Sequence, residues 1–130
     1  MRKMFFVGLL VVLTVLLAAC GSSAPMQETT SAKDVNIVVA SNPSPAMMGD
    51  AELILTITDK DGNPIEGAIV DVGADHTDMS GMGMSGLAIE QGDGKYSIKA
   101  NFDESGNWML TVKVTQDSLD YKEDIEFKVQ

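Results

Sequence analysis

The sequence has few of the residue types on which most enzymes and disulfide-bonded domains depend. Its 130 residues include one cysteine, one histidine, one tryptophan and two tyrosines. A lone cysteine cannot close a disulfide within the chain, so the fold must be held together by core packing. A single histidine in an acidic segment offers little for a Ser-His-Asp triad, and no phosphate-binding glycine loop stands between a strand and a helix. We therefore expect no enzymatic activity and no catalytic residue.

Basic residues are also scarce. Lysine and arginine together number 9 against 19 aspartates and glutamates, which gives a formal net charge of −10. Binding to nucleic acid, or to anionic lipid head groups through a folded surface, requires the opposite balance. We therefore expect no nucleic-acid partner. An acidic surface attracts cations, which suits metal traffic but is equally usual in exported domains.

Residues 1–19 have the layout of a secretory signal peptide. Arg2 and Lys3 precede an apolar run over residues 4–17, which is shorter than the roughly 20 residues of a membrane span. The following Leu-Ala-Ala-Cys20 resembles the lipobox of bacterial lipoproteins, whose cysteine is lipidated and becomes the new N-terminus. We expect a lipid such as palmitate on Cys20, anchoring the chain to the extracytoplasmic side of a cell membrane. The alternative is an ordinary secreted protein with one free thiol.

Residues 20–34 are expected to form a tether and residues 35–130 one folded domain. The first range is rich in Gly, Ser, Ala, Pro and Thr and lacks apolar periodicity, as is typical of a flexible linker. Without Arg2 and Lys3, seven basic residues remain against 19 acidic ones, so the mature chain has a formal charge of −12. A chain of this length normally forms a single domain.

Apolar and polar residues alternate in about seven short segments after the tether, at roughly ten-residue spacing. The segments are residues 35–39, 51–58, 68–72, 87–90, 95–100, 108–115 and 124–129. No helical periodicity appears among them. The pattern predicts an all-β protein, an antiparallel β-sandwich with the apolar faces packed together.

The segment between the second and third of these strands resembles the start of a calcium-binding loop. It reads Asp59-Lys-Asp-Gly-Asn-Pro64. A calcium loop needs glycine at its sixth position and glutamate at its twelfth, where this chain has Pro64 and Val70. We therefore interpret the segment as a β-turn whose polar side chains bond their own backbone.

The sole histidine and three of the nine methionines fall in one short segment, His76-Thr-Asp-Met79-Ser-Gly-Met82-Gly-Met84. Thioether sulfur is a soft donor and imidazole an intermediate one, and together they suit copper, above all Cu(I). The glycines predict a pliable loop, not a strand or helix that packs these methionines into a core. The candidate metal ligands are His76, Met79, Met82 and Met84.

Two further methionines extend this hypothesis, and two alternatives need no metal. Met47 and Met48 follow a proline turn and would be possible ligands if their loop lay at the same end of the sandwich. Methionine is also a flexible gap-filler, so these side chains could plug the end of the sandwich. Methionines in a glycine-rich loop could equally form a contact surface for a partner protein.

Several motifs, in order, resemble one known family. Residues 61–72, Asp61-Gly-Asn-Pro-Ile-Glu-Gly-Ala-Ile-Val-Asp-Val72, look like the turn and strand of many bacterial immunoglobulin-like domains. The methionine segment, Gly94-Lys-Tyr96 and Gly106-Asn-Trp108-Met-Leu-Thr-Val112 then follow in the order seen in the YtkA-like family, which includes FixH-like proteins. The resemblance covers roughly residues 35–116. Family segments often read Met-Pro with methionine-glycine repeats, whereas here His76-Thr-Asp precedes the first methionine.

The resemblance implies an immunoglobulin-like fold on the outer side of the membrane. It also implies an association with copper handling, or with the assembly of respiratory oxidases and cation pumps. One hypothesis is a lipid-anchored copper-binding protein that carries or buffers Cu(I) for a respiratory oxidase. The alternative is an immunoglobulin-like interaction module that assists a membrane complex without metal. A carbohydrate or adhesion module is weaker, because sugar-binding surfaces use exposed aromatic residues and this chain has few.

Overall fold

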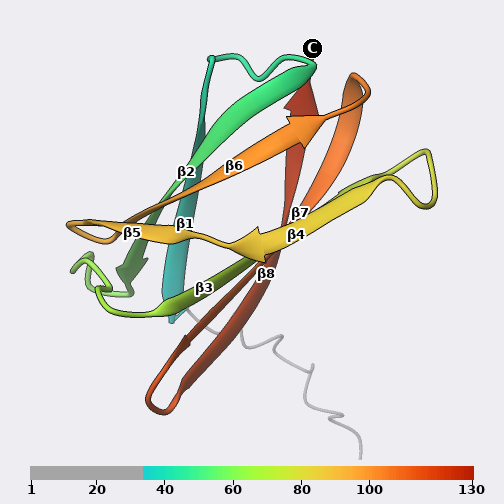
Figure 1. The fold of residues 1–130 in the computed structure, drawn as a ribbon. Helices are drawn as coiled ribbons and strands as arrows, with labels where there is room; N and C mark the ends of the chain where they lie inside the picture. Colours follow the sequence, from blue (N-terminus) through green and yellow to red (C-terminus); the bar gives the residue numbers. More distant parts are fainter. Residues whose placement is uncertain (1–33) are drawn as a thin grey trace, which may run out of the picture. The chain divides into compact units, whose positions relative to one another are not determined.

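The computed structural model describes residues 34–130, in which every regular element is a β-strand. The strands are β1 (Val35–Asn42), β2 (Gly49–Asp59), β3 (Ile69–His76), β4 (Gly83–Leu87), β5 (Ile89–Gly92), β6 (Lys95–Phe102), β7 (Gly106–Gln116) and β8 (Leu119–Val129). They form two four-stranded antiparallel sheets, ordered β1-β2-β6-β5 and β4-β3-β7-β8 (Figure 1). The predicted all-β sandwich is confirmed.

The expectations for residues 1–19, for most of the tether and for lipidation of Cys20 lie outside the described residues. Within the described part, no helix is long and apolar enough to cross a membrane.

The core lies between the two sheets and follows the predicted alternation. Leu53, Leu55 and Ile57 of β2 are fully buried from one side, and Leu110 and Val112 of β7 from the other. Their neighbours in sequence point outward, because successive side chains of a strand face opposite sides of the sheet. Burying one such aliphatic side chain stabilises the fold by about 1.5–3 kcal/mol, which compensates for the absence of disulfides in the domain.

The structure has eight strands where the sequence predicts about seven. The predicted strand over residues 87–90 is in fact the junction of β4 and β5, which belong to different sheets. The chain changes sheets at Ala88, whose N–H donates to the carbonyl of Val70 at 2.8 Å. Gly86 lies next to this crossing, and a Cβ there would approach Ile98 to 3.1 Å. Because Gly83 and Gly86 carry no side chain, β4 shows no apolar alternation in the sequence.

The turn after β2 has the predicted backbone bonding. The Asp59 carboxylate accepts the backbone N–H groups of Asp61 and Asn63 at 2.8 and 2.9 Å. The side chain and backbone of Asn63 lower the pKa of Asp59 by donating to its carboxylate. The Asp59 side chain therefore holds the turn by bonding its backbone, as expected.

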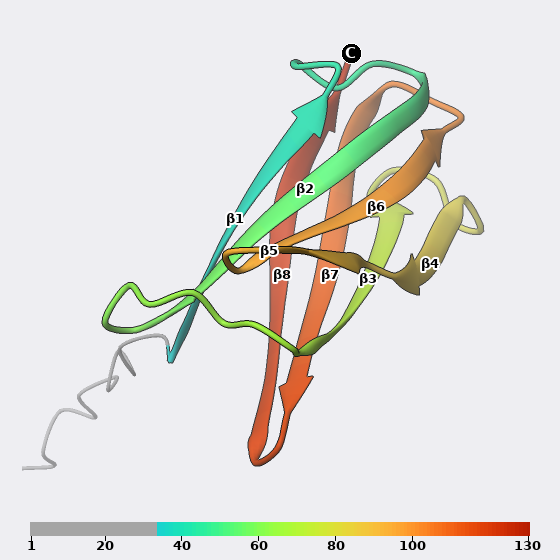
Figure 2. The ribbon, with the colours of Figure 1, turned by 60° about the vertical axis from the view of Figure 1, so that its left-hand side comes forward.

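Three loops lie at one end of the sandwich, which we call the loop end, and the β6–β7 loop stands between the other two (Figures 1 and 2). They are the β1–β2 loop (residues 43–48), the β3–β4 loop (77–82) and the β6–β7 loop (103–105). The register places them together, since β2 begins opposite the end of β6 and His76 lies opposite Trp108 near the start of β7. Met47 and Met48 therefore lie at the same end as the methionine segment.

Candidate functional site

His76 is the last residue of β3, and its imidazole is buried, with 6% of its surface exposed. Its Nδ1 accepts the backbone N–H of Asp78 at 3.2 Å, and its Nε2 lies 3.1 Å from the carbonyl oxygen of Ser105. A neutral imidazole that accepts at Nδ1 carries its proton on Nε2, so Nε2 donates to Ser105. Both ring nitrogens are thus engaged with the backbone of the loop end.

Trp108 and Gly106 complete the environment of this imidazole. The Trp108 ring meets His76 edge to face, with centroids 5.2 Å apart, and its Nε1 donates to the carbonyl of Glu104 at 3.1 Å. Gly106 has a φ of +129°, and a Cβ there would lie 2.8 Å from His76 Nε2. The three residues together hold the short β6–β7 loop against the end of β3.

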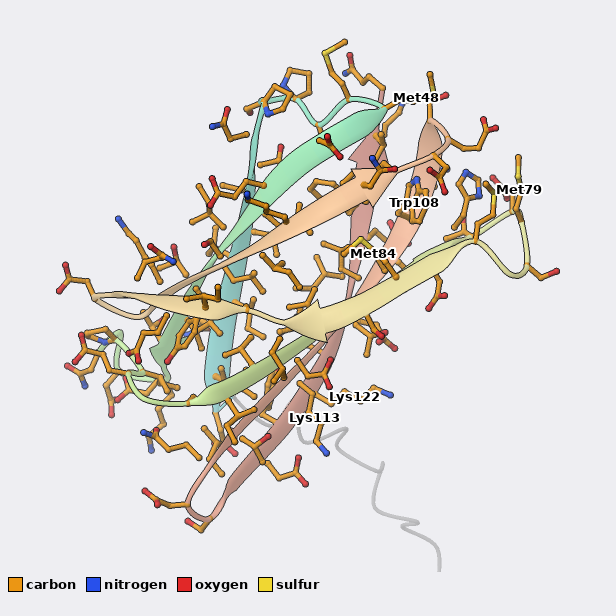
Figure 3. The ribbon with its side chains drawn as sticks, viewed as in Figure 1. Met48, Met79, Met84, Trp108, Lys113 and Lys122 are labelled. Atoms are coloured by element: carbon orange, nitrogen blue, oxygen red, sulfur yellow. The ribbon has the colours of Figure 1, made fainter. Side chains whose placement is uncertain are left out.

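Met84 belongs to β4 and faces the core. Its cross-strand partner is the fully buried Ala74, and its half-buried side chain packs against the core residues. Figure 3 shows Met84 beside the body of the sandwich and Met79 out at the tip of the β3–β4 loop. The Met84 side chain packs against the core, whereas Met79 is 44% exposed on the loop. They do not share a site in this structure.

The segment predicted as one loop is in fact strand, loop and strand. His76 closes β3 and Gly83 opens β4, so only residues 77–82 form the loop. The prediction is wrong at both ends because the N–H of His76 bonds the carbonyl of Met82 at 3.1 Å, which closes a hairpin. A Cβ at Gly83 would displace the exposed carboxylate of Asp75, which packs over this glycine.

The exposed thioethers of the loop end come from two loops. Met79 is 44% exposed on the β3–β4 loop, while Met47 and Met48 are 53% and 56% exposed on the β1–β2 loop. The half-buried Met82 stands at the base of the same hairpin as Met79. Figure 3 shows Met48 and Met79 at this end of the molecule. The backbone N–H of Met48 bonds the carbonyl of Gln130 at 2.9 Å, which fixes the β1–β2 loop to the chain beyond β8.

Exposed carboxylates share the loop end with these methionines. Asp78 lies on the β3–β4 loop, and Asp103 and Glu104 lie on the β6–β7 loop. No group of three or more His, Cys, Asp or Glu side chains within residues 34–130 is arranged to hold a metal ion. The carboxylates therefore act on a cation only through their negative potential. The atoms at this end that suit a soft cation as direct ligands are the methionine sulfurs.

The two glycine-aromatic motifs that carry the family resemblance, Gly94-Lys-Tyr96 and Gly106-Asn-Trp108, have structural roles. Gly94 allows close packing, since a Cβ there would lie 2.6 Å from the carbonyl oxygen of Ile57. The Tyr96 hydroxyl donates to the carbonyl of Ile65 at 2.9 Å and accepts the N–H of Ala68 at 3.1 Å. Burial raises the pKa of Tyr96. Gly106 and Trp108 have the same two roles at the loop end, close packing by the glycine and a hydrogen bond from the aromatic side chain to a backbone carbonyl. In the sequence, the Gly-x-aromatic spacing marks both places.

Comparisons with known proteins agree with this architecture. The YtkA-like family matches residues 29–113. A search of curated proteins found no match. A solved structure of FdeC, described as a broadly conserved Escherichia coli adhesin, superposes with a TM-score of 0.52 and 21% sequence identity. The alignment covers 76% of this chain but 32% of the adhesin, so the chain spans about a third of that protein's length.

At this level of identity the likeness to the adhesin shows the fold alone, and that fold is immunoglobulin-like. The family match extends over well over half of the chain and includes the Gly-x-Tyr motif of β6 and the Gly-x-Trp motif of β7. The chain belongs to the YtkA-like family and folds as an immunoglobulin-like module.

Proposed function

We propose that this module binds Cu(I) through the methionine thioethers of its loop end. A lipid on Cys20 would hold it on the extracytoplasmic side of the membrane, where it carries or buffers copper for a respiratory oxidase. The observation that supports copper binding is the exposure of Met47 and Met48 on the β1–β2 loop and of Met79 on the β3–β4 loop, at the same end of the sandwich. Thioether sulfur is the protein ligand best matched to Cu(I) outside the thiolates.

The ligand set that we propose differs from the one expected from spacing. Met79 and Met82 of the methionine segment, with Met47 and Met48, are the residues that would hold copper. His76 would have to give up a backbone hydrogen bond at either nitrogen, and Met84 would have to leave its packing against the core. We propose that these two residues have a structural role and hold the loop end in its conformation. Thioethers need no deprotonation before they bind and cannot form disulfides, which suits an oxidising compartment.

A competition titration against a Cu(I) chelator tests copper binding. The test variant carries Met47→Leu, Met48→Leu, Met79→Leu and Met82→Leu, because leucine keeps the volume and removes the sulfur. Met109→Leu on β7 is the matched control. We expect wild type and control to compete for Cu(I) and the fourfold variant to lose at least tenfold in affinity. Wild type that leaves the chelator fully loaded, or a fourfold variant that binds like wild type, would exclude this site.

A second candidate function uses the same surface without metal. Three half-exposed apolar side chains at one end, beside an imidazole whose nitrogens are both engaged, also describe a contact surface for a membrane protein complex. Here the fourfold variant loses its partner in a pull-down performed in metal-free buffer. A pull-down that requires added copper supports the copper-carrying function instead.

A further inference from the structure

The outer edge of β8 is a long, regular strand edge. β8 is the last strand of its sheet, and its 11 residues pair with β7 in continuous register from Leu119 to Val129 without a bulge. It contains no proline or glycine. Among the described strands, none pairs with its other side, and Figures 1 and 2 show it at the margin of the sheet. Such an edge is a template for another strand.

The direction of the backbone groups along this edge follows from the hydrogen bonds of β7. The carbonyl of Asn107 accepts the N–H of Thr77, the residue that continues β3, so the backbone groups of Asn107 face β3. Successive residues of a strand alternate in direction, so those of Trp108 face β8 and meet Phe127, its cross-strand partner. The odd-numbered residues of β8 therefore bond to β7. The even-numbered residues direct N–H and C=O to the outer edge.

Gln130 confirms this direction and marks where the available edge stops. It follows the same alternation, and its N–H and C=O bond to Ala46 and Met48 of the β1–β2 loop at 2.8 and 2.9 Å. The loop thus covers the outer side of the strand at its last position. The edge that another strand could use extends from Asp120 to Lys128.

The residues with outward backbone groups are all charged and exposed: Asp120, Lys122, Asp124, Glu126 and Lys128. Their order is self-complementary about Asp124, the midpoint of the strand. In an antiparallel pair with its two-fold axis at Asp124, Lys122 faces the partner's Glu126 and Asp120 faces the partner's Lys128. This register also gives the fullest overlap of the two strands.

Neighbouring registers lose this match. An axis at Ile125 sets Lys122 against the partner's Lys128, which places two positive charges together. An axis at Glu123 sets Asp120 against the partner's Glu126, which places two negative charges together. Like charges directly opposite each other destabilise a strand pair. The charge order therefore selects one register.

We propose that two copies of this chain pair antiparallel through β8, with the two-fold axis at Asp124, so that their β4-β3-β7-β8 sheets become one continuous sheet. One like-charge contact remains, between the two Asp124 side chains. Thr111 reduces its cost, since its hydroxyl donates to the Asp124 carboxylate at 2.7 Å and draws it over β7. Charged side chains on an edge strand usually prevent it from pairing with other strands. On β8 their order also makes the edge specific for a second copy of this chain.

Charge exchange across the axis tests this dimer. The full chain, in mild detergent and metal-free buffer, is examined by sedimentation equilibrium over a wide range of concentration. By symmetry, Lys122→Glu or Glu126→Lys alone creates two like-charge contacts, and we expect each to raise the dimer dissociation constant by about tenfold. The double variant K122E/E126K restores opposite charges and is expected to return to wild-type affinity. Lys99→Glu on β6 changes the net charge equally and should leave the dimer intact.

Amide hydrogen exchange identifies the surface independently, with circular dichroism showing that each variant is folded. The N–H groups of Lys122, Asp124 and Glu126 should exchange more slowly as the protein concentration rises. Those of Ile125 and Phe127 already bond to β7 and should change little. Wild type that stays monomeric throughout overturns this dimer. So does a dimer whose Lys122 and Glu126 amides remain unprotected, or a double variant that associates no better than the single ones.

Discussion

His76 and Trp108 meet edge to face at the loop end, and each ring donates its N–H to a carbonyl of the same short loop. The centroids are 5.2 Å apart at an interplanar angle of 75°. His76 bonds Ser105 and Trp108 bonds Glu104, so the two rings together fix the β6–β7 loop. Because His76 also accepts the N–H of Asp78, it couples that loop to the start of the methionine-bearing β3–β4 loop.

His76→Ala should reduce stability while leaving copper affinity almost unchanged. The substitution removes the hydrogen bonds of the imidazole to the Ser105 carbonyl and to the Asp78 N–H, which should cost about 0.5–1.5 kcal/mol each because both loop residues are exposed to water. Urea unfolding followed by fluorescence of the single tryptophan measures the stability, and the chelator competition measures Cu(I) affinity. If affinity fell sharply while the folded state kept its stability, the imidazole would be a ligand after all.

Gly106→Ala should destabilise the domain more than alanine at a glycine with similar backbone and free space. At Gly106 the new methyl would lie 2.8 Å from His76 Nε2, in addition to the strain of a positive φ. Gly49→Ala is the control, since its φ is +98° and no atom lies within 4 Å of the added Cβ. We expect about 1 kcal/mol for the control and at least 1–3 kcal/mol more for Gly106→Ala, measured by chemical denaturation. Equal losses would mean that the imidazole moves aside freely.

Tyr96→Phe should lower stability and change its dependence on alkaline pH. The loss of a hydroxyl that bonds Ile65 and Ala68 leaves two backbone groups unpaired and should cost about 1–3 kcal/mol. Burial raises the pKa of Tyr96 in the folded state above its ordinary value near 10.0. Above pH 10 the unfolded chain therefore releases this proton first, and stability falls as the pH rises.

The stability that the protonated Tyr96 hydroxyl contributes is fully present below pH 10, and the Tyr96→Phe variant lacks it at every pH. Wild type should lose stability more steeply than Tyr96→Phe as the pH rises through 10 and beyond, as measured by denaturant unfolding at a series of pH values. Parallel pH profiles for the two proteins would show that the hydroxyl titrates alike in the folded and unfolded states.

Most of the fold follows from local pattern. Segments such as residues 51–58 and 108–115 alternate apolar and polar side chains, and a strand with one buried face requires that alternation. The β4–β5 junction could not be predicted in this way. Gly83 takes the place of a side chain on the outward face of β4 and Gly86 of one on the inward face, so the strand leaves no periodic signal. The hydrogen bond from Ala88 to Val70 that ends the strand joins residues far apart in sequence.

The candidate site divides in a similar way. Composition alone identified the sulfur donors. Met47 and Met48 could contribute only if their loop lay at the same end of the sandwich as Met79, and in the structure it does. Sequence spacing placed His76 among the ligands because a histidine three residues before a methionine looks like part of a donor set. Its actual partner is the carbonyl of Ser105, a contact that depends on β6 and β7 being brought beside β3.

A strand-rich, acidic module without internal disulfides can be predicted from the chain alone, because these properties depend on residue composition and on the period of neighbouring side chains. Which donors remain exposed, which end carries them and which strand edge faces outward become known only from the folded molecule. Those properties depend on contacts between residues tens of positions apart. A hydrogen bond to a distant carbonyl, or the direction of an N–H along an edge strand, becomes fixed only when the two sheets have paired in register.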